Sequence, residues 1–552
     1  MTHRFALPLR AGLALASALA SALAATALPA AAQPVDLGPV PFEPSPSALP
    51  EGWEHGAFME IFVRAYQDSD GDGVGDLRGL SSRLDYLKDL GVKGLWLMPV
   101  QRNADGDHGY ATSEYRSIAP EYGTLADFDE LIRQAHARGI GVVMDYVINH
   151  SAAQHPLFQE AAKSPSNPWR DWYVWRTDAP PGWSIWDACP WYDADTRPWL
   201  STVHPKLMPR PAATAHNIYF GTFGPHMPDF NLRNPAVLDY HLASLRFWLN
   251  RGLDGYRLDA VPHMIENDAV HWNDQPESRA LTKRLQDEIK RYPRRYVVCE
   301  ATAEPAAYGD PAVCGGAFAF GYVEHFVGAA RGQAGSVRRL AEYYRSASPT
   351  MATFLSNHDI FTGGRLWDQL GGDLARYRVA AAAYLLQPGT PFIYFGEELG
   401  QAGVTALDAD QPVRSPMSWS AEPATAGFTR GTPFRPVSPN AARFNAASEA
   451  ADPASLHAFY KALLGLRNGR PSIAQGSFEA SFADGLVLGF QRRLGHERSL
   501  VLVNYDTRAA IVTVPGLAAG DRLRPLYPAG ADTPASDTLT LAPQSVQVFD
   551  IR

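Results

Sequence analysis

The chain is organised around one short stretch, Gly255-Tyr256-Arg257-Leu258-Asp259-Ala260, which ends an apolar run that begins near Leu253. Side chains alternate along a strand with period two, so Arg257 and Asp259 point to the same face. A neighbouring guanidinium favours the ionised form of a carboxyl group. We therefore expect Asp259 to stay charged, as a carboxylate nucleophile must. Taken alone, such a pair is more often a structural ion pair at the end of a strand.

Strands alternate with amphipathic helices on both sides of this stretch. The strands are continuous apolar runs, as expected for a parallel sheet covered on both faces. Repeated β/α units of this size predict an α/β protein with a (β/α)8 barrel. Seven strands are clear, at residues 58–66, 94–100, 140–148, 253–260, 296–301, 351–355 and 391–395, and an eighth at 317–326 is weaker. Helices are expected at 80–90, 125–138, 236–250, 278–292 and 374–386.

Two departures from this alternation indicate further domains. Residues 150–227 have no strand–helix pattern and are rich in Trp, Tyr, Pro and Asp. An insertion after the third strand would lie at the carboxyl face, where barrel active sites are found. Residues 471–552 show short alternating segments and predict an antiparallel β-sandwich. The catalytic barrel is then expected at residues 56–149 and 228–468.

The N-terminal residues predict an export signal. His3, Arg4 and Arg10 are positively charged, residues 11–28 are apolar, and small residues at 30–32 form a cleavage site. We expect a signal peptide at residues 1–32, a leader segment with little structure at 33–55, and a secreted or periplasmic protein without membrane attachment. The alternative is an N-terminal membrane anchor, which the short, Ala-rich run disfavours.

Length and composition limit the number of domains and the class of partner. The 552 residues are too many for one compact core, so two or three domains are expected. The formal charge is −9 and no Lys/Arg run occurs, which argues against nucleic acid. The 13 Trp and 23 Tyr residues suit a protein that stacks on sugars, although aromatic residues also fill ordinary cores. We expect a monomer.

The three cysteines, Cys189, Cys299 and Cys314, cannot form a fully paired disulfide framework. Cys299 lies in an apolar strand and is most simply a buried apolar residue. Cys189 and Cys314 could pair in an oxidising compartment. The sequence contains no C-x-x-C motif, so it does not suggest a zinc site.

A glycine-rich acidic loop occupies residues 68–76, with the sequence DSDGDGVGD. Oxygen ligands at alternate positions can wrap Ca²⁺, which takes about six to eight of them. An EF-hand would need a Glu where Gly79 stands, so the loop is of another kind. Four carboxylates this close would repel one another without a cation, which favours a metal over a solvated turn. The expected calcium ligands are Asp68, Asp70, Asp72, Val74 and Asp76.

Polar residues gather at the carboxyl ends of four predicted strands. These ends carry Asp145 to His150, Arg257 to His263, Glu300, and Asn357 to Asp359. Singly, a His or Asp at a strand end is more often a cap or a hydrogen-bonded core group. Because the strand ends of one barrel converge on one cavity, together they form a site with three carboxylates, imidazoles and an Arg.

The ordered set D-x-x-x-N-H, R-x-D, strand-end Glu and N-H-D resembles the α-amylase family of glycoside hydrolases (family 13), from about Gly56 to the end of the chain. Residues 94–99, 107–110 and 389–391 support the resemblance. Residues 227–231, M-P-D-F-N, resemble the M-P-D-L-N signature of the subfamily between oligo-1,6-glucosidases and neopullulanases. The acidic loop is also typical of that subfamily.

The resemblance implies roles for individual residues. Asp259 corresponds to the nucleophile, Glu300 to the general acid/base and Asp359 to the third carboxylate, which stabilises the transition state. A retaining glycosidase needs one ionised and one protonated carboxyl group about 5–5.5 Å apart. The apolar residues before Glu300 are expected to keep it protonated. The implied substrate-binding residues are Asp107, Tyr110, His150, Arg257, His263, Asn357 and His358.

We therefore expect a calcium-binding, retaining α-glucan hydrolase of the α-amylase type, acting on α-1,4 bonds of starch or maltooligosaccharides through a glycosyl–Asp259 intermediate. Pro262 replaces a common Lys, and Ala111 replaces a common Asp. Residues 257–262, followed by Glu266, are similar to trehalose synthases, so an α-glucosidase or a glucosyl isomerase is an alternative. Another class, a non-catalytic binding relative, is disfavoured because all three carboxylates are present.

Overall fold

The computed structural model describes residues 35–518, 520–534 and 538–552. The expected signal peptide and the first two residues of the leader lie outside this range. Residues 36–552 form one compact unit. None of the helices in the described residues combines the length and the apolar character needed to cross a membrane.

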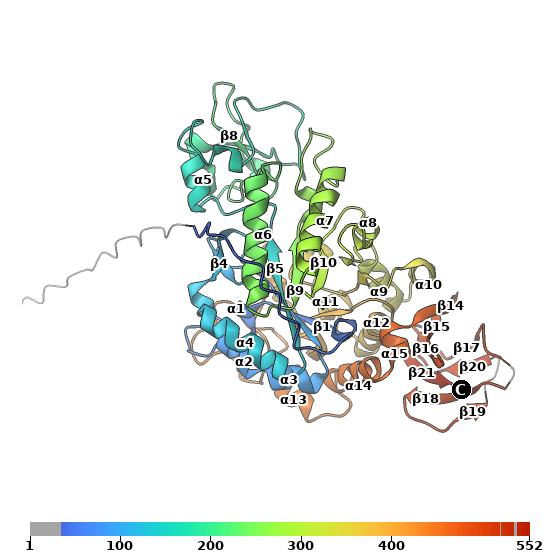
Figure 1. Ribbon diagram of the computed structural model, residues 1–552. Helices are drawn as coiled ribbons and strands as arrows, with labels where there is room; N and C mark the ends of the chain where they lie inside the picture. Colours follow the sequence, from blue (N-terminus) through green and yellow to red (C-terminus); the bar gives the residue numbers. More distant parts are fainter. Residues whose placement is uncertain (1–34, 519, 535–537) are drawn as a thin grey trace, which may run out of the picture. The chain divides into compact units, whose positions relative to one another are not determined.

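Eight parallel strands form the central sheet, in the order β12-β11-β10-β9-β5-β2-β1-β13 (Figure 1). A parallel bridge between Thr353 and Pro391 joins the two outer strands and closes the barrel. The predicted (β/α)8 fold is thereby confirmed. The strands are β1 (Phe58–Ile61), β2 (Gly94–Leu97), β5 (Gly141–Val147), β9 (Gly255–Asp259), β10 (Tyr296–Cys299), β11 (Ala317–Phe318), β12 (Met351–Ala352) and β13 (Phe392–Tyr394).

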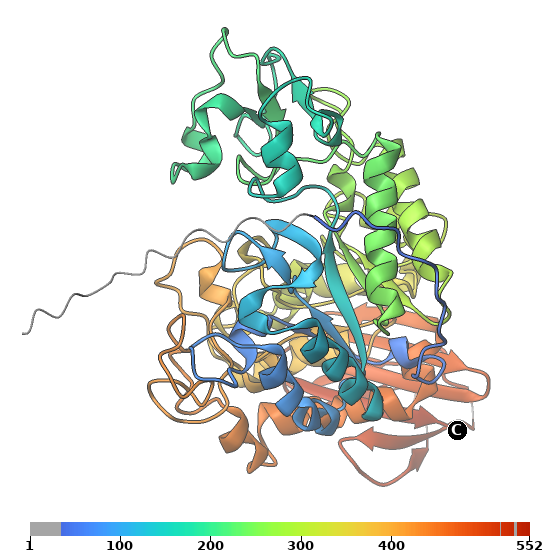
Figure 2. The same cartoon turned by 60° about the vertical axis from the view of Figure 1, so that its left-hand side comes forward.

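Helices pack around these strands (Figure 2). Their starts follow local chemistry: Thr124 and Asp127 form a capping box at α4, and Asn234 caps α6 with Pro235 at the first helical position. The principal helices are α2 (Leu77–Ser82), α3 (Leu84–Leu90), α4 (Leu125–Ala137), α6 (Pro235–Asn250), α7 (Pro276–Lys290), α10 (Ala334–Ser346), α12 (Leu374–Leu385) and α14 (Leu456–Gly469).

All eight predicted strands were longer than the observed ones, and two of the predicted ranges run into a helix. The first ends at Ile61, and α1 (Val63–Tyr66) follows it. The eighth ends at Phe318, and the rest of the predicted range runs through a turn at Gly321, with φ 85°, into α9 (Val323–Ala330). Both errors have one cause, because a short apolar run fits a buried strand and a buried helix equally well.

Residues 36–57, the described part of the compact unit before β1, have no helix or strand apart from a short 3-10 turn at Trp53–His55, yet several of them are buried. Leu49 and Trp53 are buried in one hydrophobic cluster with Phe58 and other barrel residues. Arg294 donates hydrogen bonds to the carbonyls of Ser47 and Leu49. The leader therefore contributes to the core of the barrel.

The insertion between β5 and α6 contains a small antiparallel sheet with the order β6-β8-β7. Its bounds are β6 (Trp175–Arg176), β7 (Trp191–Asp193) and β8 (Ile218–Phe220), preceded by α5 (Pro156–Ala161). Buried aromatic residues, including Trp183, Trp191 and Phe220, give the insertion a core of its own. Its high Trp content is thus explained in part by packing.

The C-terminal part contains the predicted antiparallel β domain. A six-stranded sheet, β14-β15-β16-β21-β18-β19, packs with the two-stranded sheet β17-β20 around a shared apolar core that includes Leu500, Val512 and Leu541. The strands are β14 (Ser477–Asp484), β15 (Val487–Leu494), β16 (Glu497–Asn504), β17 (Ala510–Thr513), β18 (Arg522–Tyr527), β19 (Thr533–Pro534), β20 (Thr538–Leu541) and β21 (Ser545–Ile551).

The expectation that Cys299 is unpaired and that Cys189 could pair with Cys314 was wrong. Cys299 and Cys314 form a disulfide with their Cα atoms 6.4 Å apart, and Cys189 is free. The two partners meet because Cys299 ends β10 and Cys314 lies just before the adjacent strand β11. Sequence alone gave no sign that the chain between them returns to the same strand end.

Two carboxyl groups lie buried after the last barrel strand. Burial raises the pKa of Glu397 and of Glu398 to about 7. Tyr384, Tyr460 and Ser356 donate hydrogen bonds to Glu397, and Tyr86 donates one to Glu398. A folded-state pKa above the unfolded value favours the protonated form, so these groups lower stability as the pH rises from about 4.5 to 7.

Glu398→Gln is therefore expected to gain stability relative to the wild type as the pH rises. The difference in unfolding free energy between variant and wild type should grow by about 3 kcal/mol between pH 4.5 and 7.5, because glutamine has no proton to lose. Urea unfolding at several pH values measures it. Glu342→Gln, at an exposed site, is the control and should show no such trend. A pH-independent difference for Glu398→Gln would contradict the account.

Candidate active site

A cavity of about 590 Å³ opens where the barrel strands end. Side chains from the ends of β9 and β10 line it, together with the loop after β12 and the insertion. The predicted site residues that line it are Tyr110, His150, Asp259, His263, Glu300 and Asp359. The other predicted substrate-binding residues do not line the cavity but contact residues that do. They are Asp107, Arg257, Asn357 and His358.

Arg257 is the hub of the site. It is almost fully buried, and its Nη1 lies 2.8 Å from Asp145 Oδ1 and also contacts Asp259. Its Nη2 lies 3.0 Å from Glu300 Oε2. The planar guanidinium of Arg257 thus holds the carboxyl groups of Asp259 and Glu300 at fixed positions relative to each other. The backbone N–H of Ala260, which has φ 52°, donates to the same Glu300 oxygen at 3.0 Å.

The charge state of this cluster differs from the expectation. Burial raises the pKa of Asp259 well above its usual range; Arg257 lowers it, and the charges of Glu300 and Asp145 raise it further. Burial also raises the pKa of Asp145. The sequence-based argument considered only Arg257 and missed that three carboxyl groups share it. The cluster therefore keeps a proton to higher pH than isolated carboxyl groups do.

Asp359 has the opposite electrostatic environment. Burial alone would raise its pKa, but His358 and Arg414 hold it well below the usual range. The carboxylate lies 3.2 Å from His358 Nε2 and 3.1 Å from Arg414 Nη2. Burial lowers the pKa of His358, yet Asp359 and Glu60 together raise it to about 10, so this imidazole is cationic. Asp359 is therefore an ionised carboxylate facing the cavity.

Tyr110 connects the carboxyl cluster around Arg257 with the His358–Asp359 pair. Its hydroxyl donates to Asp145 Oδ2 at 2.8 Å and lies 2.8 Å from His358 Nε2. Its ring stacks on His358 with centroids 5.3 Å apart. Burial raises its pKa well above the usual value, so the phenol stays protonated. Tyr110 is thus held between the β5 residue Asp145 and His358 in the loop after β12.

Two neutral imidazoles line the cavity. Burial lowers the pKa of His150 to about 3 and that of His263 to about 4. His150 Nε2 and His263 Nδ1 are buried and have no hydrogen-bond partner within the described part of the chain. His263 is packed between Trp272, which stacks on it, and Trp186.

Arg414 is a site residue that sequence reasoning missed. It is buried, lines the cavity, and contacts Asp359. Its Nη1 lies 3.7 Å from Asp107, which also accepts a hydrogen bond at 3.0 Å from Arg435. Asp107 is therefore held by two arginines. Residues 400–445 follow the last barrel strand without any regular pattern, so no spacing marked Arg414 in advance.

Asn357 organises the loop instead of facing the cavity. Its Oδ1 accepts hydrogen bonds from the backbone N–H of Asp359 and from the hydroxyl of Thr362, both at 2.8 Å. It fixes the position of the third carboxylate.

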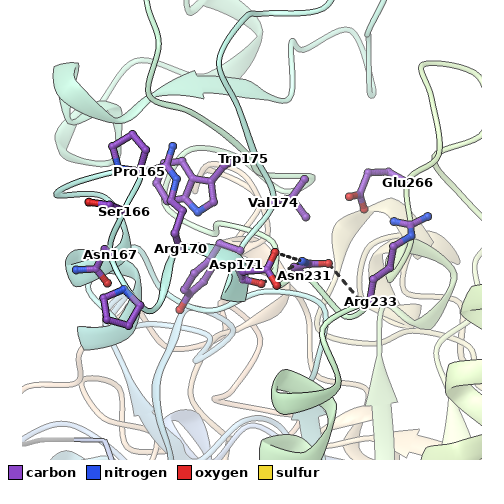
Figure 3. A pocket seen from close by; sticks show the side chains of 12 residues that line it. Pro165, Ser166, Asn167, Arg170, Asp171, Val174, Trp175, Asn231, Arg233 and Glu266 are labelled. Carbon is purple, nitrogen blue, oxygen red and sulfur yellow. Dashed lines mark hydrogen bonds between the residues drawn. The ribbon is translucent and has the colours of Figure 1, made fainter.

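A second cavity of about 550 Å³ lies beside the insertion and contains none of the predicted catalytic residues (Figure 3). Trp175, its largest side chain, is covered on one side by Phe158 and on the other by the guanidinium of Arg170. The Asp171 carboxylate accepts hydrogen bonds from the side-chain amides of Asn231 and Asn234. Glu266 also lines this cavity, but among the described residues no arginine holds it and Asp171 together as Arg257 holds Asp259 and Glu300 in the first cavity.

The acidic loop forms a second cluster of carboxylates. Asp68, Asp70 and Asp76 each offer an oxygen within 4.8 Å of the others. Burial tends to raise the pKa of Asp68, but hydrogen bonds from Thr429 and from backbone N–H groups lower it below the usual value. The side chain of Asp72 instead accepts the backbone N–H of Val74 at 2.7 Å. Within the described range none of these four carboxylates forms an ion pair with a basic side chain.

The family model for the α-amylase catalytic domain matches residues 60–476. The chain belongs to the α-amylase family. It is therefore an enzyme of the glycoside hydrolase class, whose members include hydrolases and transglycosylases.

Several family members are similar along most of the chain. Trehalose synthase/amylase TreS of Mycolicibacterium smegmatis is 32% identical over 81% of this chain and 81% of its own length. Alpha-amylase 3 of Dictyoglomus thermophilum is 31% identical, with 83% and 86% covered, and the alpha-glucosidase of Pediococcus pentosaceus is 29% identical, with 84% and 93% covered. Trehalulose synthase MutB of Pseudomonas mesoacidophila has a solved structure with a TM-score of 0.76, 25% identity, and 91% and 99% coverage.

Proposed function

We propose that this α-amylase family member is a retaining α-glucan hydrolase that cleaves α-1,4-glucosidic bonds of starch or maltooligosaccharides. The observation that carries the proposal is the pair of carboxyl groups, Asp259 and Glu300, bound to one buried guanidinium at the mouth of the barrel. Retaining glycosidases need two such groups close together, one as nucleophile and one as acid/base.

The proposed reaction requires the proton that the cluster keeps to lie on Glu300, with Asp259 ionised. Asp259 then attacks the anomeric carbon while Glu300 gives its proton to the departing glycosidic oxygen. Glu300 then takes a proton from water, which attacks the same carbon and releases Asp259. Each step has a transition state with positive charge on the sugar. The ionised Asp359, fixed by His358 and Arg414, is suited to stabilise that charge.

A second candidate is favoured by the relatives. An α-glucosidase or a trehalose-forming isomerase would use the same carboxyl groups on shorter substrates. The cavity volume of about 590 Å³ lies in the range of sites for small molecules, which suits short oligosaccharides. Relatives named trehalose synthase/amylase and α-glucosidase are similar in sequence to this chain over 81% and 84% of its length.

A product profile separates these candidates. The purified protein is incubated with calcium and, separately, with soluble starch, maltotriose and maltose, and products are resolved by chromatography. Mixed maltooligosaccharides from starch and slow attack on maltose support the α-amylase type. Glucose from maltose with little action on starch supports an α-glucosidase, and trehalose from maltose supports an isomerase. No change in any substrate would contradict both candidates.

We further propose that the acidic loop binds Ca²⁺. The donors fit, because a hard cation prefers carboxylate oxygens and the three clustered carboxylates lack a cationic partner among the described residues. Asp68, Asp70 and Asp76 would hold the ion, with Asp72 and Val74 as the remaining candidate ligands. The ion would neutralise their mutual repulsion and stabilise the loop against residues 428–434, with which it shares hydrogen bonds.

Removal of calcium is expected to lower thermal stability. A ligand present at about 100 times its dissociation constant stabilises the folded state by about 2.7 kcal/mol, so chelation should lower the Tm of a chain of this size by about 2–3 °C. Calorimetry with and without a chelator measures the shift, and Asp68→Asn/Asp70→Asn should abolish it. Asp85→Asn, at an exposed carboxylate elsewhere, should leave it intact. An unchanged Tm on chelation, with no metal detected by elemental analysis, would contradict the proposal.

We also propose that the protein is exported and monomeric. The Cys299–Cys314 disulfide supports export, because disulfides persist in oxidising compartments. N-terminal sequencing of protein from the culture medium or periplasm should begin at Gln33. Recovery only in the cytoplasm with the N-terminus intact would contradict export, and light scattering tests the monomer.

A further inference from the structure

The Cys299–Cys314 disulfide lies directly beside the residue that is proposed to be the general acid/base. Cys299 is the last residue of β10, and Glu300 follows it immediately. Because side chains alternate, Cys299 points away from the face on which Glu300 projects. Both cysteines are fully buried. The cross-link therefore joins the back of this strand end to the chain 15 residues later.

This strand end has little other support on one side. β9 and β10 are paired at four positions, whereas β10 and β11 are paired only at Cys299 and Ala317. At this pairing, the Cys299 N–H donates a hydrogen bond to Gly316 O at 2.9 Å. The disulfide falls at one of the two places in the barrel where neighbouring strands are paired at a single position.

The loop closed by the disulfide carries residues that face the cavity. Its first residue after Cys299 is Glu300, and Thr302 also lines the cavity. Glu304, with φ 47°, is in the left-handed region, which a residue with a side chain rarely adopts. The return of the chain is tight, because a Cβ atom at Gly316 would lie 2.5 Å from Val297 O.

We infer that the Cys299–Cys314 disulfide is a positioning element for Glu300, holding the end of β10 so that the Glu300 carboxyl group stays against Arg257 and Ala260. This inference rests on the proposed function of Glu300. Without the cross-link, the far end of the 300–314 loop would be held by non-covalent contacts alone, such as the hydrogen bond from the Thr350 hydroxyl to Gly309 O and the burial of Tyr308. Displacement of a catalytic group by about 1 Å can cost about a hundredfold in rate.

The test uses substrates that differ in their need for an acid. Hydrolysis of maltotriose requires protonation of the leaving oxygen, whereas fluoride leaves from an α-glucosyl or α-maltosyl fluoride without it. The ratio kcat/KM reports the first chemical step alone for a covalent mechanism. We expect Cys299→Ala/Cys314→Ala to lower kcat/KM for maltotriose at least about tenfold and for the fluoride less than about threefold.

Two control variants keep the outcomes distinct. Cys189→Ala removes the free thiol and should change neither value. Cys299→Ala/Cys314→Val fills more of the buried volume, and it replaces the first variant if that one is recovered unfolded. Equal losses on both substrates, or no loss on either, would overturn the inference while leaving the proposed function intact. A wild-type protein inactive on both substrates would instead contradict the proposed function.

Discussion

Replacing Asp259 by Asn is expected to abolish turnover while leaving the fold intact. The amide cannot attack the anomeric carbon, so kcat/KM should fall at least about a thousandfold, which corresponds to about 4 kcal/mol of transition-state stabilisation. Arg257 keeps Asp145 and Glu300 as partners, so no buried charge is left unpaired. Because burial disfavours the ionised form of Asp259, the neutral variant should be at least as stable as the wild type at pH 7.

Steady-state kinetics on maltotriose and calorimetry on the same preparation measure both effects. Calcium-dependent stability should be retained, because the acidic loop is a separate cluster. Near-normal turnover by Asp259→Asn would exclude this residue as the nucleophile. Loss of activity together with a collapse of the Tm would show instead that Asp259 is structural.

Replacing Glu300 by Gln is expected to affect substrates unequally. Glutamine keeps the size of the side chain and a hydrogen-bonding oxygen near Ala260 N–H, but it has no proton to give. Without general acid catalysis, kcat/KM for maltotriose should fall by about 10²- to 10⁴-fold. For the glycosyl fluoride, kcat/KM should change little, because that leaving group needs no proton.

Azide provides the control for the second step. Without a general base, water attacks the glycosyl–enzyme slowly, so kcat for the fluoride should fall, and added azide should restore it. The expected product is the glycosyl azide with the configuration opposite to that of the enzyme-bound sugar. Uniform loss on both substrates without azide rescue would remove Glu300 from the acid/base role.

The barrel and the convergence of its strand ends followed from local sequence patterns. Continuous apolar runs predicted the parallel strands, and polar residues at their ends were brought to one cavity because parallel strands share a carboxyl face. The R-x-D spacing placed Arg257 and Asp259 in contact, as period-two alternation requires. These relations depend on near neighbours or on one strand at a time.

What could not be predicted depends on contacts between distant segments. Arg414 comes from an irregular stretch long after β13, yet it holds Asp359. Cys314 meets Cys299 only because the loop between them returns beside β11. The charge state of Asp259 depends on burial and on Asp145, which lies on another strand. Pairing of this kind is set by tertiary structure, and a single sequence carries no periodic signal for it.

Trapping of the covalent intermediate tests the central claim most directly. A 5-fluoroglycosyl fluoride reacts with the nucleophile of a retaining glycosidase, and the fluorine slows the release of the sugar. Mass spectrometry of the intact protein should show the gain of one fluoroglycosyl group, and peptide mapping should place it on Asp259. An adduct on another residue, or no adduct on a protein that hydrolyses maltotriose, would contradict the account.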